Sequence, residues 1–199
     1  MESYNLFSNT NQTQSNAPLA DKLRPKNLDE FFGQESILGN NSLLRNAILN
    51  DKVGNIIFYG PPGVGKTTLI EIISSNTRSS LIKLNAVLTS IKELRNEIAN
   101  AQERLISSNR KTILFIDEVH RFTAIQQDAL LPSIENGTIT FIGATTENPF
   151  FAVNKALISR ARIFSLLSLN RNDLKKIIDR VINYYACLQD SKAIKITEE

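Results

Sequence analysis

Two short motifs carry residues that bind phosphate and metal at a characteristic spacing. Residues 60–67 read Gly-Pro-Pro-Gly-Val-Gly-Lys-Thr, which fits the pattern G-x-x-x-x-G-K-[ST] in full. In such a loop the glycines let the backbone turn tightly and direct its N–H groups at a phosphate. Lys66 supplies a charge for the β- and γ-phosphates, and the hydroxyl of Thr67 supplies a ligand for Mg²⁺. The motif therefore predicts a site for a nucleoside triphosphate with Mg²⁺.

A pair of adjacent carboxylates, Asp117 and Glu118, follows the apolar run at residues 113–116. Asp117 ends a predicted buried strand, from which it can reach the shell of a bound Mg²⁺. Glu118 is the candidate that orients and deprotonates an attacking water. An acidic pair alone could also cap the helix that follows. Its combination with the phosphate-binding loop is what predicts hydrolysis of the triphosphate.

The elements that must position these motifs alternate between strand and helix. A strand at 55–59 precedes the loop and a helix at 66–77 follows it, which is the context that the loop requires. We expect an α/β fold, with a parallel five-stranded sheet flanked by helices and the nucleotide at the carboxyl ends of the strands. The other predicted strands are 81–84, 112–117, 138–146 and 162–169. The other predicted helices are 41–49, 90–107, 125–135, 154–159 and one that Asn170 or Asn172 caps and that extends to Tyr185.

The composition excludes several classes of protein. With 42% hydrophobic and 22% charged residues, the 199-residue chain is typical of soluble globular proteins. No apolar run approaches the length of a membrane span, and the N-terminus lacks the pattern of a secretory signal. The single cysteine, Cys187, excludes an internal disulfide, and the only histidine, His120, is expected in a polar network beside the acidic pair. A net charge of +3 is too small to indicate nucleic-acid binding.

Longer segments carry a resemblance that the loop alone, which many proteins share, does not. Two of them are specific in combination: Asp-Glu-Val-His-Arg-Phe at 117–122 and Gly-Ala-Thr-Thr-Glu-Asn-Pro at 143–149. Together with the segments at 18–25, 32–34, 60–68, 112–116, 126–132, 134–135, 137–142 and 157–162, they resemble the AAA+ ATPases. Within the clamp-loader-like branch, they resemble the replication-associated recombination protein A family, whose eukaryotic counterpart is the Werner helicase-interacting protein. The resemblance implies a P-loop NTPase core.

The resemblance and the composition together divide the chain into three parts. Residues 1–17, rich in Asn, Gln, Ser and Thr, are expected to form a disordered tail. Residues 18–168 resemble the AAA+ nucleotide-binding core, and 169–199 only the first helix of a truncated helical lid. In the family the lid continues, with a second sensor arginine and an oligomerisation region. We therefore expect an N-terminal piece of a longer protein, with Thr197 as the N-cap of a further helix, that binds ATP poorly or hydrolyses it slowly.

The resemblance also implies roles for polar residues outside the two motifs. Thr146 resembles sensor 1, which positions the water and reads the γ-phosphate, although by itself it is a hydroxyl at a strand end. Asn85 resembles a residue that holds Glu118 away from water until the ligand arrives. Arg160 resembles an arginine finger that reaches the nucleotide of a neighbouring subunit, with Arg162 as the alternative; either could instead form a surface salt bridge. A finger implies a homo-oligomer.

The candidate site residues therefore form three groups. The segment 19–34 resembles the part that packs on adenine, so the resemblance implies ATP rather than GTP; otherwise the segment is a plain loop. The catalytic candidates are Glu118, Lys66, Thr146 and Arg160, and the Mg²⁺ ligands are Thr67 and Asp117. The nucleotide-binding candidates are Gly60, Pro61, Pro62, Gly63, Val64, Gly65, Lys66, Thr67, Thr68, Asp117, Leu19, Arg24, Pro25 and Gln34.

The function that the segment 117–122 favours is a DNA-associated ATPase of replication and recombination, acting at stalled forks. The alternatives are a clamp-loader subunit, a Holliday-junction branch-migration motor and an ATP-binding remnant without turnover. The resemblance implies that the full-length protein contacts DNA and single-strand-binding or replication proteins. It also implies a location in the cytoplasm with the nucleoid, and no membrane.

Overall fold

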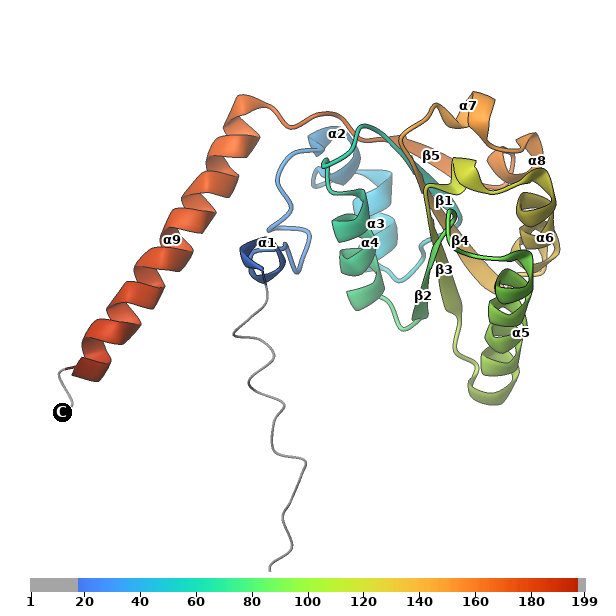
Figure 1. Cartoon of the computed structure of the whole chain (residues 1–199), viewed down its shortest axis with the longest axis horizontal. Helices are drawn as coiled ribbons and strands as arrows, with labels where there is room; N and C mark the ends of the chain where they lie inside the picture. The colour runs from blue at the N-terminus through green and yellow to red at the C-terminus, as the bar shows by residue number, and fades with distance from the viewer. Residues whose placement is uncertain (1–17, 197–199) are drawn as a thin grey trace, which may run out of the picture.

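A computed structural model describes residues 18–196 of the chain, and the side chains as far as residue 186. Its centre is a five-stranded sheet in the order β2-β3-β4-β1-β5, in which every neighbouring pair is parallel (Figure 1). The predicted parallel sheet flanked by helices is confirmed. The strands are β1 (Ile56–Tyr59), β2 (Ser80–Asn85), β3 (Thr112–Asp117), β4 (Ile139–Thr145) and β5 (Arg162–Ser165).

Helices cover both faces of the sheet because successive side chains of a strand point to opposite sides. Phe58 packs into an apolar cluster on one face, and its neighbour Ile57 packs into the cluster on the other. The first cluster includes residues of α2 (Glu35–Leu38), α3 (Leu43–Leu49) and α4 (Lys66–Ser75). The second includes residues of α5 (Ile91–Ser108), α6 (Ala124–Glu135) and α8 (Lys155–Ile158). The resulting three-layer core fixes the strand ends that carry the candidate site.

The strand order brings the polar strand ends together at one edge. Tyr59 of β1 is in register with Thr145 of β4, and Asn85 of β2 with Asp117 of β3. Since all strands are parallel, the loop after β1, the acidic pair after β3 and the residues after β4 lie at the same edge of the sheet. Ligands of parallel α/β sheets bind at this edge.

Two predicted boundaries differ from the observed ones by more than two residues. The last strand ends at Ser165 rather than at 169, because the backbone N–H of Leu167 binds the side chain of Gln34 and the chain leaves the sheet there. The last helix, α9 (Arg171–Ile196), does not end at Tyr185, since the sequence beyond that residue contains neither glycine nor proline. Of the two proposed caps, Asn170 accepts a hydrogen bond from the N–H of Asp173.

Four short helical segments escaped prediction. They are α1 (Leu19–Lys22), α2, the 3₁₀ helix η1 (Val119–Arg121) and α7 (Pro149–Ala152), each too short to show helical periodicity. The predicted tail at 1–17 and the predicted cap Thr197 lie outside the described residues. Among the helices of the described part, none is long and apolar enough to cross a membrane.

Helix α9 leads away from the sheet on the side of α1 and α2 (Figure 1). It is attached to the N-terminal segment by an ion pair of 2.6 Å between Arg180 Nη2 and Glu30 Oε2. The ammonium of Lys176 lies 6.0 Å from the centre of the Phe32 ring. The first half of α9 therefore lies beside the carboxyl edge of the sheet.

Candidate functional site

A cavity of about 800 Å³ lies at the carboxyl edge of the sheet, between the loop after β1, the N-terminal segment and α9. Its volume is in the range of small-molecule sites. One wall is apolar and includes Leu23, Phe31, Ile177 and Val181. The predicted residues that line it are Leu19, Arg24, Pro25, Pro62, Gly63, Val64, Gly65, Lys66, Thr67, Thr68, Asp117 and Glu118.

The glycines of the loop allow a backbone that other residues would block. Gly65 has φ +97°, and a Cβ there would lie 2.7 Å from Cζ of Phe31. Gly63 has φ +78° with nothing within 4 Å of a Cβ position, so its backbone faces open space. Helix α4 starts directly after this turn, at Lys66, and directs its positive N-terminal end at the cavity. The loop is thus shaped to receive an anion.

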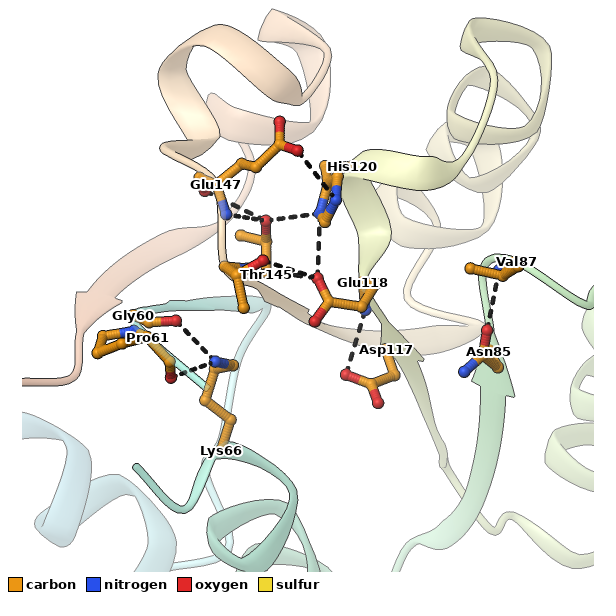
Figure 2. Close-up of polar contacts among 11 residues, drawn as sticks. Gly60, Pro61, Lys66, Asn85, Val87, Asp117, Glu118, His120, Thr145 and Glu147 are labelled. Carbon is orange, nitrogen blue, oxygen red and sulfur yellow. Dashed lines mark hydrogen bonds and ion pairs between the residues drawn. The ribbon is translucent and has the colours of Figure 1, made fainter. Parts of the chain in front are cut away.

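Lys66 lies within the loop rather than in solvent. Its Nζ donates hydrogen bonds to the carbonyl oxygens of Gly60, at 2.7 Å, and of Pro61, at 2.9 Å (Figure 2). Burial lowers the pKa of Lys66, while the carboxylates of Glu118 and Asp117 act to raise it. Gly60 and Pro61 therefore contribute by holding this ammonium, since neither lines the cavity.

Asp117 stands at the end of β3 with its Oδ1 accepting a 3.2 Å hydrogen bond from the N–H of Glu118. Burial raises the pKa of Asp117, and the neighbouring charge of Glu118 raises it further. The described residues contain no group of three or more His, Cys, Asp or Glu that could hold a metal alone. Asp117 and Thr67 fit Mg²⁺ in its usual protein setting, in which one or two side chains share the ion with phosphates and water.

Glu118 is held in an uncommon backbone conformation, with φ 53° and ψ 48°. A non-glycine residue in this left-handed region is strained, and such residues cluster at functional sites. Its Oε2 accepts hydrogen bonds from the backbone N–H of Thr146, at 3.4 Å, and from the Thr146 hydroxyl, at 3.3 Å. The structure therefore brings the predicted base into contact with the predicted sensor, which lies directly after β4.

Two predicted residues are engaged elsewhere. The amide of Gln34 donates to the carbonyl of Leu167 at 2.7 Å and accepts from its N–H at 2.9 Å, so Gln34 joins the N-terminal segment to the chain after β5 and does not line the cavity. The Oδ1 of Asn85 accepts from the N–H of Val87 at 2.9 Å (Figure 2). The partners of Glu118 in this structure are Thr146 and His120 instead.

Arg160 lies between α8 and β5 and does not line the cavity of its own chain. Its Nη2 lies 2.5 Å from Oε1 of Glu135, and its Nη1 donates to the carbonyl of Ala156 at 2.9 Å. Arg162, the alternative, is an exposed residue at the start of β5. The structure thus leaves both arginines outside the pocket that the other candidates form.

Contacts that sequence reasoning missed link the N-terminal segment to α4 and β2. Arg24 pairs with Glu71 of α4 at 3.1 Å, and Glu71 also pairs with Lys83 of β2 at 2.5 Å. No signal in the sequence joins residues this far apart in the chain. The pairs fix one side of the cavity wall to which Arg24 contributes.

Comparison with known proteins places this geometry in a family. A model described as the Holliday junction DNA helicase RuvB P-loop domain matches residues 23–158. The chain belongs to this family of P-loop domains. A solved structure of the Thermotoga maritima RuvB Holliday junction branch migration motor is similar, with a TM-score of 0.66 and 31% sequence identity. That similarity covers 82% of this chain and 55% of the RuvB chain.

Curated relatives of this RuvB-type domain include the family that its motifs predicted. The Replication-associated recombination protein A of Haemophilus influenzae is 48% identical over 165 residues, which are 83% of this chain and 37% of the relative. The ATPase WRNIP1 of Dictyostelium discoideum is 41% identical over 181 residues, 91% of this chain and 20% of the relative. The predicted kinship is confirmed. The chain spans well under half the length of these relatives.

Proposed function

We propose that this RuvB-type domain binds ATP with Mg²⁺ and hydrolyses it to ADP and phosphate. The observation that carries the proposal is the convergence of Lys66, Asp117 and Glu118 on one cavity that is also lined by apolar residues. Phosphates fit the charged end, where the loop and the start of α4 supply N–H donors. The adenine fits the apolar wall, to which Leu19 and Pro25 contribute.

Each of these residues has a separate role in the in-line attack of water on the γ-phosphate. Lys66 neutralises the β- and γ-phosphates, and Thr67 and Asp117 hold the Mg²⁺ that offsets their remaining charge. Glu118 takes a proton from the water, which the hydroxyl of Thr146 orients. Arg160 of a neighbouring copy stabilises the charge that develops in the transition state. This assignment makes the working form a homo-oligomer.

The names of the relatives support a biological setting. We propose a DNA-associated ATPase of replication and recombination, located in the cytoplasm with the nucleoid. Within the chain, we place the nucleotide-binding core at 18–168 and the start of a helical lid at α9. A branch-migration motor is the second candidate, because the matching family model and the solved structure both carry the RuvB name.

The test is ATP hydrolysis, measured as phosphate release with and without single-stranded, forked and Holliday-junction DNA. Replacing Glu118 with Gln should keep ATP binding and reduce turnover by about 10²–10⁴-fold, the range for loss of a general base. Glu103→Gln, on the exposed side of α5, is the matched control and should change neither. Retained turnover in Glu118→Gln would remove Glu118 as the base. Stimulation by Holliday junctions alone would favour the branch-migration motor.

A further inference from the structure

The histidine beside the acidic pair makes polar contacts on both sides of its ring. His120 belongs to η1, and its side chain is only 6% exposed. Its Nδ1 lies 2.9 Å from Oγ1 of Thr145 and 3.2 Å from Oε2 of Glu118. Its Nε2 lies 3.3 Å from Oε1 of Glu147 (Figure 2). The ring thus connects the loop after β3 with the loop after β4.

Counting donors and acceptors fixes which nitrogen carries a proton. Thr145 is fully buried; its hydroxyl donates to the carbonyl of Glu147 at 3.1 Å and accepts from the N–H of Glu147 at 3.0 Å. Since that hydroxyl has one proton and has given it away, His120 Nδ1 must be the donor to Thr145. The carboxylate of Glu118 also only accepts. The single Nδ1–H is therefore shared between two acceptors, of which Oγ1 of Thr145 is the nearer and Oε2 of Glu118 the farther.

Three donors consequently meet on a single oxygen of Glu118. The backbone and the hydroxyl of Thr146 approach Oε2 from one side, and His120 Nδ1 approaches it from another. Figure 2 shows the other carboxylate oxygen turned away from His120, toward the side of Lys66 and Asp117. The left-handed backbone of Glu118 places its Cβ but leaves the side-chain torsions free. The three donors therefore supply the orientation of the carboxylate.

We propose that His120 is a positioning residue for ATP hydrolysis. It holds Oε2 of Glu118, with Thr146, so that the second oxygen is presented to the attacking water. The hydroxyl of Thr145 in turn holds the ring at Nδ1. This inference rests on the proposed role of Glu118 as the base and adds a residue that orients its carboxylate.

The expected effect is on the chemical step and not on nucleotide binding. His120 does not line the cavity, so its loss should leave the dissociation constant of ATP within about two- to three-fold of wild type. A base that is displaced by about 1 Å can lose about 10²-fold in rate, and we expect His120→Ala to lower kcat by about 10- to 100-fold. His120→Asn places an amide N–H near the position of Nδ1 and should recover most of that loss.

A matched control distinguishes an effect on the orientation of Glu118 from an effect on the stability of the fold. Gln127 is 5% exposed, donates to the carbonyl of Phe122 and accepts from the N–H of Asn154, and neither partner is one of the residues that bind Glu118. Gln127→Ala should lower the melting temperature and leave kcat unchanged.

A second measurement needs no turnover. His120 is the only histidine in the chain, so the ¹⁵N imidazole spectrum contains one residue and reads its protonated nitrogen directly. We expect a proton on Nδ1 and a shifted Nδ1 resonance in Glu118→Gln. An unprotonated Nδ1, an unchanged kcat in folded His120→Ala, or an Asn variant no better than Ala would overturn the inference. Absence of hydrolysis by the wild-type chain would instead refute the proposed function, and turnover retained by Glu118→Gln would remove Glu118 as the base.

Discussion

Removing the guanidinium of Arg160 should abolish turnover only where subunits meet. Arg160 does not line the cavity of its own chain, so Arg160→Ala should bind ATP as wild type does. A trans arginine finger is worth about 10³- to 10⁵-fold in rate. We therefore expect the assembled Arg160→Ala protein to hydrolyse ATP at least about 10³-fold more slowly than the assembled wild type.

The ion pair between Arg160 and Glu135 is too weak to prevent Arg160 from acting as an arginine finger. The two side chains are 38% and 51% exposed, and a pair so open to solvent contributes at most about 1 kcal/mol. Releasing Arg160 from Glu135 therefore costs at most about a five-fold change in rate, against the thousand-fold or larger effect of the finger. Glu135→Gln should accordingly change turnover by less than about five-fold.

A mixing experiment tests whether the arginine acts across subunits. Lys66→Ala chains lack a working site but carry Arg160, whereas Arg160→Ala chains have the site but no finger. Each should be inactive alone, and a mixture should regain activity that rises with protein concentration as mass measurements show assembly. A loss in Arg160→Ala that is equally large for dissociated subunits would refute the reasoning. The same loss in Arg162→Ala alone would transfer the role to that residue.

Two further predictions concern the frame around the cavity. A Cβ at Gly60 would collide with the backbone oxygen of Leu166, so Gly60→Ala should destabilise the fold by about 1–3 kcal/mol in urea unfolding. Gly54→Ala, where a Cβ meets nothing within 4 Å, should change it by less than about 0.5 kcal/mol; equal effects would contradict the packing argument. Burial acts to raise the pKa of Glu71, but its ion pairs with Lys83 and Arg24 outweigh burial and lower the pKa below its ordinary value. A carboxylate with a lowered pKa stabilises the fold at pH values above its unfolded-state pKa, and this stability is lost as the pH falls through its folded-state pKa. Glu71→Gln should therefore lower the free energy of unfolding by about 0.5–1 kcal/mol at pH 7 and change it little near pH 3. A difference that stays as large at low pH would show that the charge of Glu71 is not the cause.

The sequence was sufficient for features that are encoded locally. The order of strands and helices follows from apolar periods, and the phosphate loop follows from one continuous motif. The end of β5 was not predictable in this way, because it depends on the amide of Gln34, which lies far away in the chain and takes the N–H of Leu167. The four-residue helices α1 and α7 left no periodic signal in the sequence.

The candidate site likewise combines features that the local sequence encodes with contacts that depend on the fold. Asp117 and Glu118 are adjacent in the sequence, and their place at a strand end could be predicted. The contact of Glu118 with Thr146 follows only once β3 and β4 are neighbours, and its contact with His120 depends on the turn of η1. Asn85 lies on the neighbouring strand in register with Asp117, yet its side chain turns to Val87. Register alone therefore does not decide which polar groups meet.

The position of β4 gives the loop that follows it two neighbours. β4 lies between β1, which leads into the phosphate loop, and β3, which leads into the acidic pair. Thr145 therefore ends beside Tyr59, while the next residue, Thr146, reaches Glu118. A contact between the γ-phosphate and Thr146 would compete for the hydroxyl that now donates to Glu118. The N–H of Thr146 and Nδ1 of His120 would still bind Oε2. The carboxylate would therefore keep its orientation while the Thr146 hydroxyl changes partner.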